Sequence, residues 1–232
     1  MNETPFIYRA KEFAGVRPLF VLPSAGNVPY FEGHGGAPEA KLIEWAERLM
    51  PKEGYFLDIG AHVGTWGITF ALKGHAVQCF EAQPWLASLC SAGFALNGLR
   101  RGCAPFGFSD KSGTFELTSP YADGGCGSVV CKFEGDLPIR IQVELRTLDA
   151  EYDLTPDVKV SLMKIDVEGS ELDVLRGGKR TIQMWRPAII FEAWEEEKGQ
   201  RKEELFRFIK DKMKYKAIKT SWPDTWLAEY EG

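Results

Sequence analysis

The stretch Tyr55-Phe-Leu-Asp-Ile-Gly-Ala-His-Val-Gly-Thr-Trp-Gly67 decides the fold of this chain. Its first residues form an apolar run that ends in Asp58, which is typical of a buried strand. Gly60 and Gly64 then allow the backbone to turn tightly, and the pattern of residues 66–72 predicts a helix. The stretch therefore predicts a strand, a tight loop and a helix in succession.

A second apolar run, residues 76–80, ends on Glu81, which lies 23 residues after Asp58. In nucleotide-binding α/β folds, an acidic side chain at about this separation accepts hydrogen bonds from a ribose. The two signals together predict a pocket for a nucleotide cofactor.

Strand and helix patterns alternate along most of the remaining chain. Helices are expected at residues 38–50, 86–97, 172–184 and 205–213. Strands are expected at residues 103–108, 160–165, 187–192, 215–220 and 226–230. We predict an α/β fold with a single Rossmann-like, doubly wound sheet of about seven strands, mostly parallel with an antiparallel edge at the C-terminus.

Two segments fall outside this alternation. Residues 1–38 are rich in Gly and Pro, which predicts an N-terminal cap or substrate-side segment beside a main domain at residues 39–232. Within the main domain, residues 113–147 alternate like an antiparallel excursion around the glycine-rich stretch 123–128. We expect this insertion near 113–147 to act as a flexible lid.

Composition narrows the classes of partner and compartment. The 232 residues carry a net charge of −5 without a dense basic cluster, so nucleic acid is not expected as a partner. No run approaches the ~18 apolar residues of a membrane span, and the N-terminus lacks the basic and apolar regions of a signal peptide. The five cysteines form no Cys-x-x-Cys pair, which indicates a reducing compartment. We expect a soluble, cytoplasmic protein without a membrane span.

His62 indicates which cofactor the loop accepts. It stands where the dinucleotide fingerprint Gly-x-Gly-x-x-Gly has the second glycine, which admits a pyrophosphate. S-adenosylmethionine has no phosphate, and it needs a tight loop for its amino-acid part, an acid for its ribose and an apolar slot for its adenine. Gly60 to Gly64, Glu81 and the strand end 107–110 meet these needs. The residues expected to bind this cofactor are Asp58, Gly60, Ala61, His62, Gly64, Thr65, Glu81, Ala82, Gln83, Phe108, Ser109 and Asp166.

Four patches carry the most specific patterns of the chain. They are Phe56-Leu-Asp-Ile-Gly-Ala-His-Val-Gly64, Phe80-Glu-Ala-Gln-Pro84, residues 97–113, and Leu162-Met-Lys-Ile-Asp-Val-Glu-Gly-Ser-Glu171 with its continuation to Gly178. In order and spacing, from about residue 39 to residue 194, the chain resembles class I S-adenosylmethionine-dependent methyltransferases of the FkbM type. The family often has Asn in place of His62 and Glu-Pro-x-Pro in place of Glu81-Ala-Gln-Pro84. The resemblance implies the seven-stranded class I fold and O-methylation, commonly of sugar or polyketide-linked hydroxyls.

Methyl transfer from a sulfonium is a direct displacement, so the protein has to align the acceptor oxygen and assist the loss of its proton. Ligands of open α/β sheets bind beyond the carboxyl ends of the strands, where Asp58, Glu81, Asp166 and Glu192 are expected. In related sugar methyltransferases, an acid after the fourth strand and acids after the fifth strand can hold a magnesium ion beside the acceptor. Asp166 is therefore expected to be the base or a ligand of Mg²⁺, with Glu192 as its metal partner.

Two further side chains are candidates for catalysis. Glu168 could take part in the reaction, or it could stabilise the N-terminus of the following helix. His62 could serve as an alternative base, because an unperturbed pKa of ~6.5 suits neutral pH, or it could only pack beside the cofactor.

The function predicted from these patterns is O-methylation of a hydroxyl of a sugar or glycan, with S-adenosylmethionine as the methyl donor. An NAD-dependent sugar oxidoreductase or epimerase is one alternative, because it shares the strand, loop and ribose acid. A non-catalytic cofactor-binding module is the other.

Overall fold

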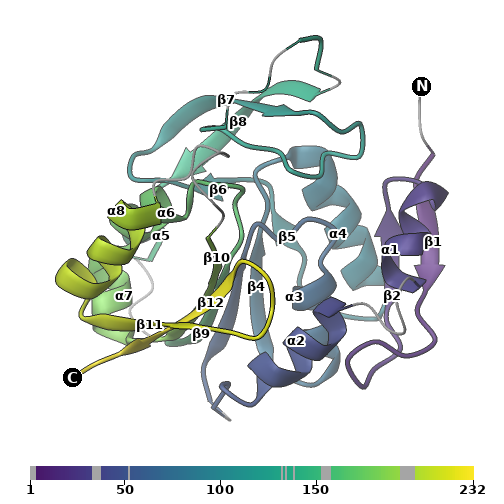
Figure 1. Cartoon of the computed structure of the whole chain (residues 1–232). Helices are drawn as coiled ribbons and strands as arrows, with labels where there is room; N and C mark the ends of the chain where they lie inside the picture. Colours follow the sequence, from purple (N-terminus) through teal and green to yellow (C-terminus); the bar gives the residue numbers. More distant parts are fainter. Residues whose placement is uncertain are drawn as a thin grey trace.

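The computed structural model describes residues 4–32, 38–51, 53–131, 133, 135–137, 139–152, 158–193 and 202–232. A seven-stranded sheet with the order β11-β12-β10-β9-β3-β4-β5 forms the centre of the protein (Figure 1). Its strands are β3 (Tyr55–Ile59), β4 (Ala76–Phe80), β5 (Cys103–Ala104), β9 (Val160–Ile165), β10 (Ala188–Glu192), β11 (Tyr215–Lys219) and β12 (Thr225–Tyr230). Strands β5, β4, β3, β9 and β10 pair in parallel, whereas β12 runs antiparallel to both β10 and β11. The predicted α/β sheet with an antiparallel C-terminal edge is confirmed.

Helices cover both faces of this sheet, because successive side chains of a buried strand point to opposite sides. Phe56 of β3 packs into one core, and the next residue, Leu57, packs into the other. The first core contains side chains of α2 (Pro38–Glu47), α3 (Thr65–Leu72) and α4 (Pro84–Leu96). The second contains side chains of α5 (Leu148–Tyr152), α6 (Glu171–Gly177), α7 (Lys179–Trp185), α8 (Lys202–Arg207) and the π-helix η3 (Phe208–Met213). The doubly wound arrangement brings the carboxyl ends of β3, β4 and β9 to one edge of the sheet.

The insertion between β5 and α5 forms a second sheet above this edge (Figure 1). Its three strands are β6 (Gly107–Phe108), β7 (Gly113–Ser119) and β8 (Ile139–Arg146), in the order β6-β8-β7. The antiparallel pairing of β7 with β8 confirms the excursion expected at residues 113–147. The single strand expected at residues 103–108 is wrong: β5 and β6 belong to different sheets. Pro105 lies between them, and a proline has no N–H to continue a ladder.

The N-terminal segment packs against α4. It contains β1 (Phe6–Arg9), β2 (Leu19–Leu22), the short 3-10 helix η1 (Ala25–Asn27) and α1 (Val28–Glu32). Asn97, at the end of α4, accepts a hydrogen bond from the Leu19 N–H at 2.9 Å and donates one to the Leu19 carbonyl at 2.7 Å. Phe20 and Phe31 belong to the same core as α2, α3 and α4. The segment therefore has a fixed place beside the main sheet.

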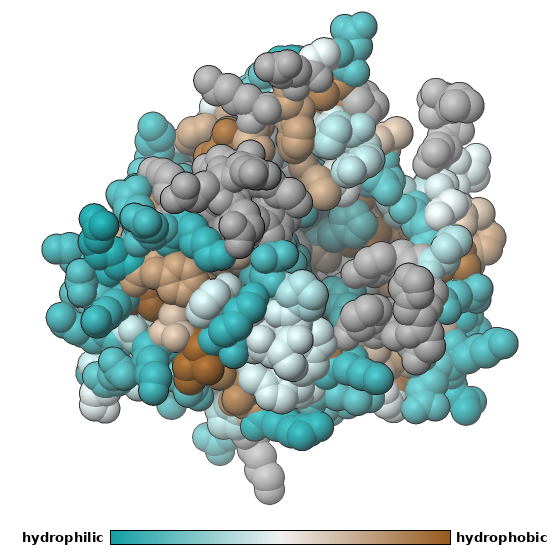
Figure 2. Space-filling model, in the orientation of Figure 1, coloured by the Kyte–Doolittle hydropathy of each residue, from teal (hydrophilic) through white to brown (hydrophobic). Residues whose placement is uncertain are grey.

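The expected helix at residues 172–184 occurs as α6 and α7, which meet at Gly177-Gly178 as the sequence indicates. All five cysteines are free thiols. Among the described residues, none of the helices has the length and apolar character needed to cross a membrane. Figure 2 shows hydrophobic residues at the top of this face, among β7 and β8, and a second group at its lower left, with hydrophilic residues around both.

Candidate cofactor and active site

The loop between β3 and α3 is fixed by hydrogen bonds and by a close backbone approach. The N–H groups of Gly60 and Ala61 both donate to the Phe80 carbonyl, at 2.9 and 3.0 Å. Gly60 has a φ of +79°, and a Cβ at this position would lie 1.8 Å from the backbone oxygen of Asp166. Only glycine fits such a contact, so the loop after β3 and the loop after β9 can touch.

Glu81 is buried at the end of β4 and faces this loop. Its two carboxylate oxygens accept hydrogen bonds of 2.9 Å from the backbone N–H groups of His62 and Gln83. Burial raises the pKa of Glu81, although the two hydrogen bonds act in the opposite direction. The Gln83 amide continues the chain of contacts by donating from Nε2 to the Gly124 carbonyl at 2.8 Å. The insertion is thereby tied to the acid that was predicted to bind a ribose.

Asp58 lies beneath the loop and is fully buried. Its Oδ2 accepts a hydrogen bond of 3.0 Å from the Gly67 N–H in the first turn of α3, and its Oδ1 lies 3.7 Å from Lys164 Nζ. Burial raises the pKa of Asp58 to about 7, and the positive charge of Lys164 limits the rise. These contacts give Asp58 a structural role in joining β3 to α3.

Lys164 is a site residue that the sequence patterns did not single out. Its Nζ donates to the Gly60 carbonyl at 2.9 Å and lies 3.1 Å from Asp166 Oδ2. Burial acts to lower the pKa of Lys164, but Asp166 and Asp58 raise it above its ordinary value. The available signal was a single cation within the buried strand β9, because a buried lysine needs acidic partners.

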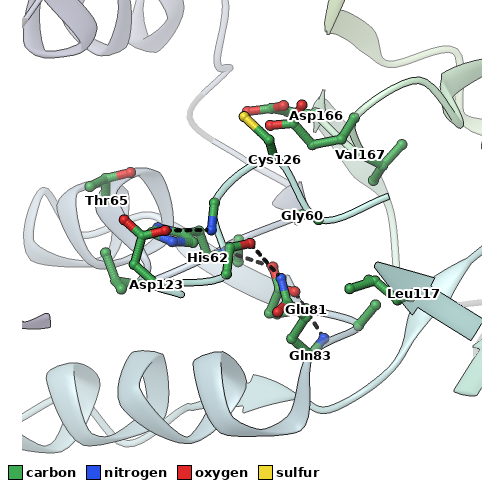
Figure 3. Close-up of a pocket in the computed structure, with 18 of the residues that line it drawn as sticks. Gly60, His62, Thr65, Glu81, Gln83, Leu117, Asp123, Cys126, Asp166 and Val167 are labelled. Atoms are coloured by element: carbon green, nitrogen blue, oxygen red, sulfur yellow. Dashed lines mark hydrogen bonds between the residues drawn. The ribbon is translucent and has the colours of Figure 1, made fainter. Parts of the chain in front are cut away.

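A cavity of about 440 Å³ opens above these residues. Figure 3 shows its walls: Gly60 and His62 from the cofactor loop, Glu81 and Gln83 after β4, Asp123 and Cys126 from the insertion, and Asp166 after β9. The predicted residues that line it are Gly60, Ala61, His62, Thr65, Glu81, Ala82, Gln83, Phe108, Asp166 and Glu168. The predicted residues placed elsewhere are Asp58, Gly64, Ser109 and Glu192. Gly64 instead begins α3, where a Cβ would lie 2.7 Å from Cys90 Sγ.

The candidate catalytic groups differ in their surroundings. Asp166 has a side chain that is 27% exposed and faces the cavity beside Lys164. Burial lowers the pKa of His62, so its ring is neutral at pH 7, and its buried Nε2 has no hydrogen-bond partner among the described residues. Burial, followed by repulsion from Asp166, raises the pKa of Glu192 to about 9. Glu192 therefore holds a proton at neutral pH.

Glu171, the first residue of α6, holds the loop between β9 and this helix. Glu171 Oε1 accepts hydrogen bonds from the N–H groups of Val167 and Gly169, at 3.1 and 3.3 Å. Glu168 has a φ of +56°, lines the cavity, and accepts a hydrogen bond of 2.7 Å from Ser128 Oγ at its backbone carbonyl. The side chain of Glu168 therefore lies on the cavity, and the alternatives of a catalytic or a helix-stabilising role for it stay predictions.

The described residues do not assemble a complete metal site. Within them, no group of three or more His, Cys, Asp or Glu side chains is arranged to hold an ion. Asp166 faces the ammonium of Lys164, and Glu192 lies outside the cavity lining. A hard cation such as Mg²⁺ favours several oxygen ligands, so this donor set does not fit one.

Further lining residues come from parts of the chain far from the motifs. Glu39, on α2, accepts hydrogen bonds at Oε1 from Trp66 Nε1 at 2.7 Å and from Thr65 Oγ1 at 3.2 Å. Asn27, beside α1, donates from Nδ2 to Asp123 Oδ2 at 2.9 Å. Nothing in the local sequence marks these residues, because their partners are brought near only by the fold.

The family model of the methyltransferase FkbM domain matches residues 58–217, which is more than half of the chain. The chain belongs to the FkbM methyltransferase family. Among curated relatives, the methyltransferase sdnD of Sordaria araneosa is 26% identical to this FkbM chain, over 63% of the chain and 68% of the relative. The family establishes methyl transfer as the class of activity.

Solved structures support the fold of the FkbM chain. A methyltransferase FkbM from Methylobacillus flagellatus superposes with a TM-score of 0.50 at 20% identity, covering 77% of this chain and 44% of that chain. A 16S rRNA methyltransferase of T. thermophilus, in complex with AdoMet and guanosine, superposes with a TM-score of 0.52 at 14% identity, covering 98% of this chain and 51% of that chain. This chain thus spans about half the length, or less, of both structures. At such identities, the likeness shows the methyltransferase fold alone.

Proposed function

We propose that this FkbM chain is an S-adenosylmethionine-dependent O-methyltransferase that acts on a hydroxyl of a sugar or glycan. The observation that carries the proposal is the position of Glu81 and Asp166 on one cavity, beside a glycine that no other residue can replace. The T. thermophilus structure, which contains AdoMet, supports the proposal that this fold binds S-adenosylmethionine here.

The residues around the loop fit the cofactor. The Glu81 carboxylate is suited to the ribose hydroxyls, because two backbone N–H groups hold it in place. Gly60 and Ala61 leave room for the amino-acid part, and Phe108 offers an apolar surface to the adenine. S-adenosylmethionine, when bound, supplies a methyl group on a positively charged sulfur.

Asp166 is the base that we assign to the acceptor hydroxyl. The Lys164 ammonium pairs with Oδ2 of Asp166, so Oδ1 of Asp166 is the oxygen that takes the proton from the acceptor hydroxyl. His62 is the second candidate, because its neutral ring lines the same cavity. Glu168 lies beside them on the lining, whereas the protonated Glu192 does not act as a base.

A binding and turnover experiment tests the proposal. Calorimetric titrations with S-adenosylmethionine and with NAD separate the methyltransferase from the oxidoreductase alternative. Turnover with a panel of hexose and deoxysugar glycosides, with and without EDTA, then tests the acceptor and the predicted Mg²⁺ together. Binding of NAD alone, or binding without methylation of any glycoside, contradicts the proposal.

Two variants assign the base. Asp166→Asn keeps the shape of the side chain, and we expect it to bind the cofactor within about threefold of wild type but to lose about 10²–10⁴ in kcat. His62→Asn should leave kcat within about tenfold if the ring only packs beside the cofactor. A larger loss in His62→Asn than in Asp166→Asn transfers the role of base to the histidine.

A further inference from the structure

The side of the cavity that faces the N-terminal segment is built partly by residues that precede the match to the family model. That match begins at residue 58, whereas Leu22, Asn27, Phe31 and Glu39 all line the cavity. Asn27 reaches the glycine-rich loop of the insertion, which supplies residues 123–127 to the lining. This acceptor end, made of the N-terminal segment and the insertion loop, is where this chain can differ from others that share the motifs.

One hydrogen bond joins the two sides of the acceptor end. Asn27 Nδ2 donates to Asp123 Oδ2 at 2.9 Å, although the residues are 96 positions apart. Each side chain is also fixed within its own segment: Asn27 Oδ1 accepts from the Ser24 N–H at 3.1 Å, and Asp123 Oδ1 accepts from the Gly125 N–H at 3.0 Å. The pair is therefore held in one arrangement, which is what a recognition contact requires.

The insertion loop is also anchored to the cofactor and base segments. Gln83 Nε2 donates to the Gly124 carbonyl, and the Gln83 N–H donates to Glu81. On the other side, Ser128 Oγ donates to the Glu168 carbonyl at 2.7 Å. An acceptor that approaches Asp166 has to fit beneath a loop whose position depends on both segments.

Charge at the acceptor end is almost entirely negative. Glu39, Asp123, Asp166 and Glu168 contribute four carboxylates to the lining, and Lys164 is the single Lys or Arg among the described lining residues. Lys164 is already engaged by two acids, the buried Asp58 and the partly exposed Asp166. An anionic group on the acceptor would meet several like charges without a cation to pair with, whereas a neutral or amine-bearing acceptor would not.

We propose that the Asn27–Asp123 pair determines acceptor specificity, and that the acceptor is a hydroxyl compound that is uncharged or carries an amine. Compounds with a phosphate or carboxylate beside the reacting hydroxyl, including nucleic acid, are rejected at this end of the cavity. The proposal rests on the proposed function, because it describes the acceptor of the same reaction.

The substrate class is tested with matched acceptors. Each glycoside of the panel is compared with its 6-phosphate and, where available, with its amino-sugar counterpart. We expect kcat/KM for the phosphate to be lower by at least about tenfold, and the amino sugar to be used as well as the neutral glycoside. Equal use of the phosphate, or methylation of an RNA oligonucleotide in the same assay, overturns the assignment but leaves methyl transfer itself intact.

The pair is tested by exchanging its two side chains. Asn27→Asp places two carboxylates together, and Asp123→Asn removes the charge. The double variant keeps both the hydrogen bond and the charge, because Asn at 123 can donate to Asp at 27. We expect each single variant to raise the acceptor KM by about tenfold with little change in the Kd of S-adenosylhomocysteine, which is neutral at its sulfur, and the double variant to recover. A purely structural role would instead weaken the acceptor and S-adenosylhomocysteine together, and it would overturn the proposal.

A binding measurement tests the acidic acceptor end without any acceptor. Sinefungin carries a protonated amine in place of the methylated sulfur, whereas S-adenosylhomocysteine is neutral there. Asp123→Asn should weaken sinefungin by about fivefold to tenfold and S-adenosylhomocysteine by less than about twofold. Equal effects on the two ligands contradict the acidic acceptor end. Failure of both ligands to bind wild type contradicts the proposed function itself.

Discussion

Lys164 Nζ lies 3.1 Å from Asp166 Oδ2, and the same ammonium donates a hydrogen bond to the Gly60 carbonyl. The candidate base and the cofactor loop are thus fixed by one buried cation. Asp58, on the neighbouring strand, lies 3.7 Å from the same nitrogen. The positions of Asp58, Gly60 and Asp166 therefore all depend on the buried charge of Lys164.

Removal of the Lys164 charge should destabilise the protein strongly. In Lys164→Met, Asp58 and Asp166 lose their buried counter-ion, and breaking a buried pair in this way costs about 3–5 kcal/mol. Urea unfolding measures the loss. The matched control is Lys216→Met on the exposed side of β11, which should change the free energy of unfolding by about 0.5 kcal/mol or less. Similar losses in both variants would show that Lys164 is not the organising charge.

Gly60 should be intolerant of any side chain. Gly60→Ala carries the cost of a positive φ, and its Cβ would also lie 1.8 Å from the Asp166 backbone oxygen. Gly98, with a φ of +71° and open space where a Cβ would lie, carries only the first cost. We expect about 1–2 kcal/mol for Gly98→Ala and clearly more for Gly60→Ala, together with loss of cofactor binding. Thermal unfolding measures the loss of stability, and calorimetry measures cofactor binding. Equal results for Gly60→Ala and Gly98→Ala would contradict the close approach of Gly60 to Asp166.

Local patterns were sufficient to predict the central sheet and to place Glu81 at the end of a strand beside Gly60 and Ala61. The strand before Asp58 and the strand before Glu81 are short, apolar and bounded by turn residues, so their order and their shared edge follow from chain connectivity. The strand expected at residues 103–108 failed because Pro105 has no N–H to donate, and two sheets share that segment. Pro105 argues against a continuous strand, but the apolar residues around it favour one, and the prediction followed the apolar residues.

The acceptor end could not be predicted in the same way. Two strand–helix units, β3–α3 and β4–α4, and the first part of the insertion separate Asn27 from Asp123, and neither residue lies in a periodic segment. Their contact exists only because the N-terminal segment packs on α4 while the insertion lies above the strand ends. Long-range polar contacts leave no local signal, so only the three-dimensional arrangement identifies them.

The stability of the protein should fall as the pH rises toward 9, because Glu192 is protonated in the folded state. Burial raises its pKa from 4.5 to about 9, so the folded state holds a proton that the unfolded state releases. The contribution of Glu192 to the free energy of unfolding is complete below its ordinary pKa of 4.5. It is lost as the pH rises from 4.5 to the folded-state pKa of about 9. Asp58 has a folded-state pKa of about 7, so it also lowers the free energy of unfolding as the pH rises, but only up to about pH 7.

Glu192→Gln should remove the upper part of this dependence. Between pH 7 and 9, wild type should lose about 2 kcal/mol more than the variant, since one pKa unit corresponds to about 1.4 kcal/mol. Urea unfolding at several pH values measures the difference. Glu116→Gln, an exposed change on β7, is the control and should follow the wild-type curve. Parallel curves for wild type and Glu192→Gln would contradict a protonated Glu192.

Glu81→Gln should weaken every ligand that contains the adenosine ribose, because the ribose hydroxyls would lose a charged acceptor that backbone N–H groups hold in place. A hydrogen bond to a charged group contributes about 1.5–3 kcal/mol, so we expect the cofactor Kd to rise by about 10-fold to 150-fold. S-adenosylmethionine, S-adenosylhomocysteine and sinefungin share the ribose and should weaken alike, unlike in Asp123→Asn, where only the cationic ligands respond. Calorimetry distinguishes the two patterns, with Glu116→Gln as the control for the loss of a carboxylate elsewhere. A cofactor Kd within about twofold of wild type in Glu81→Gln would remove Glu81 from the binding site.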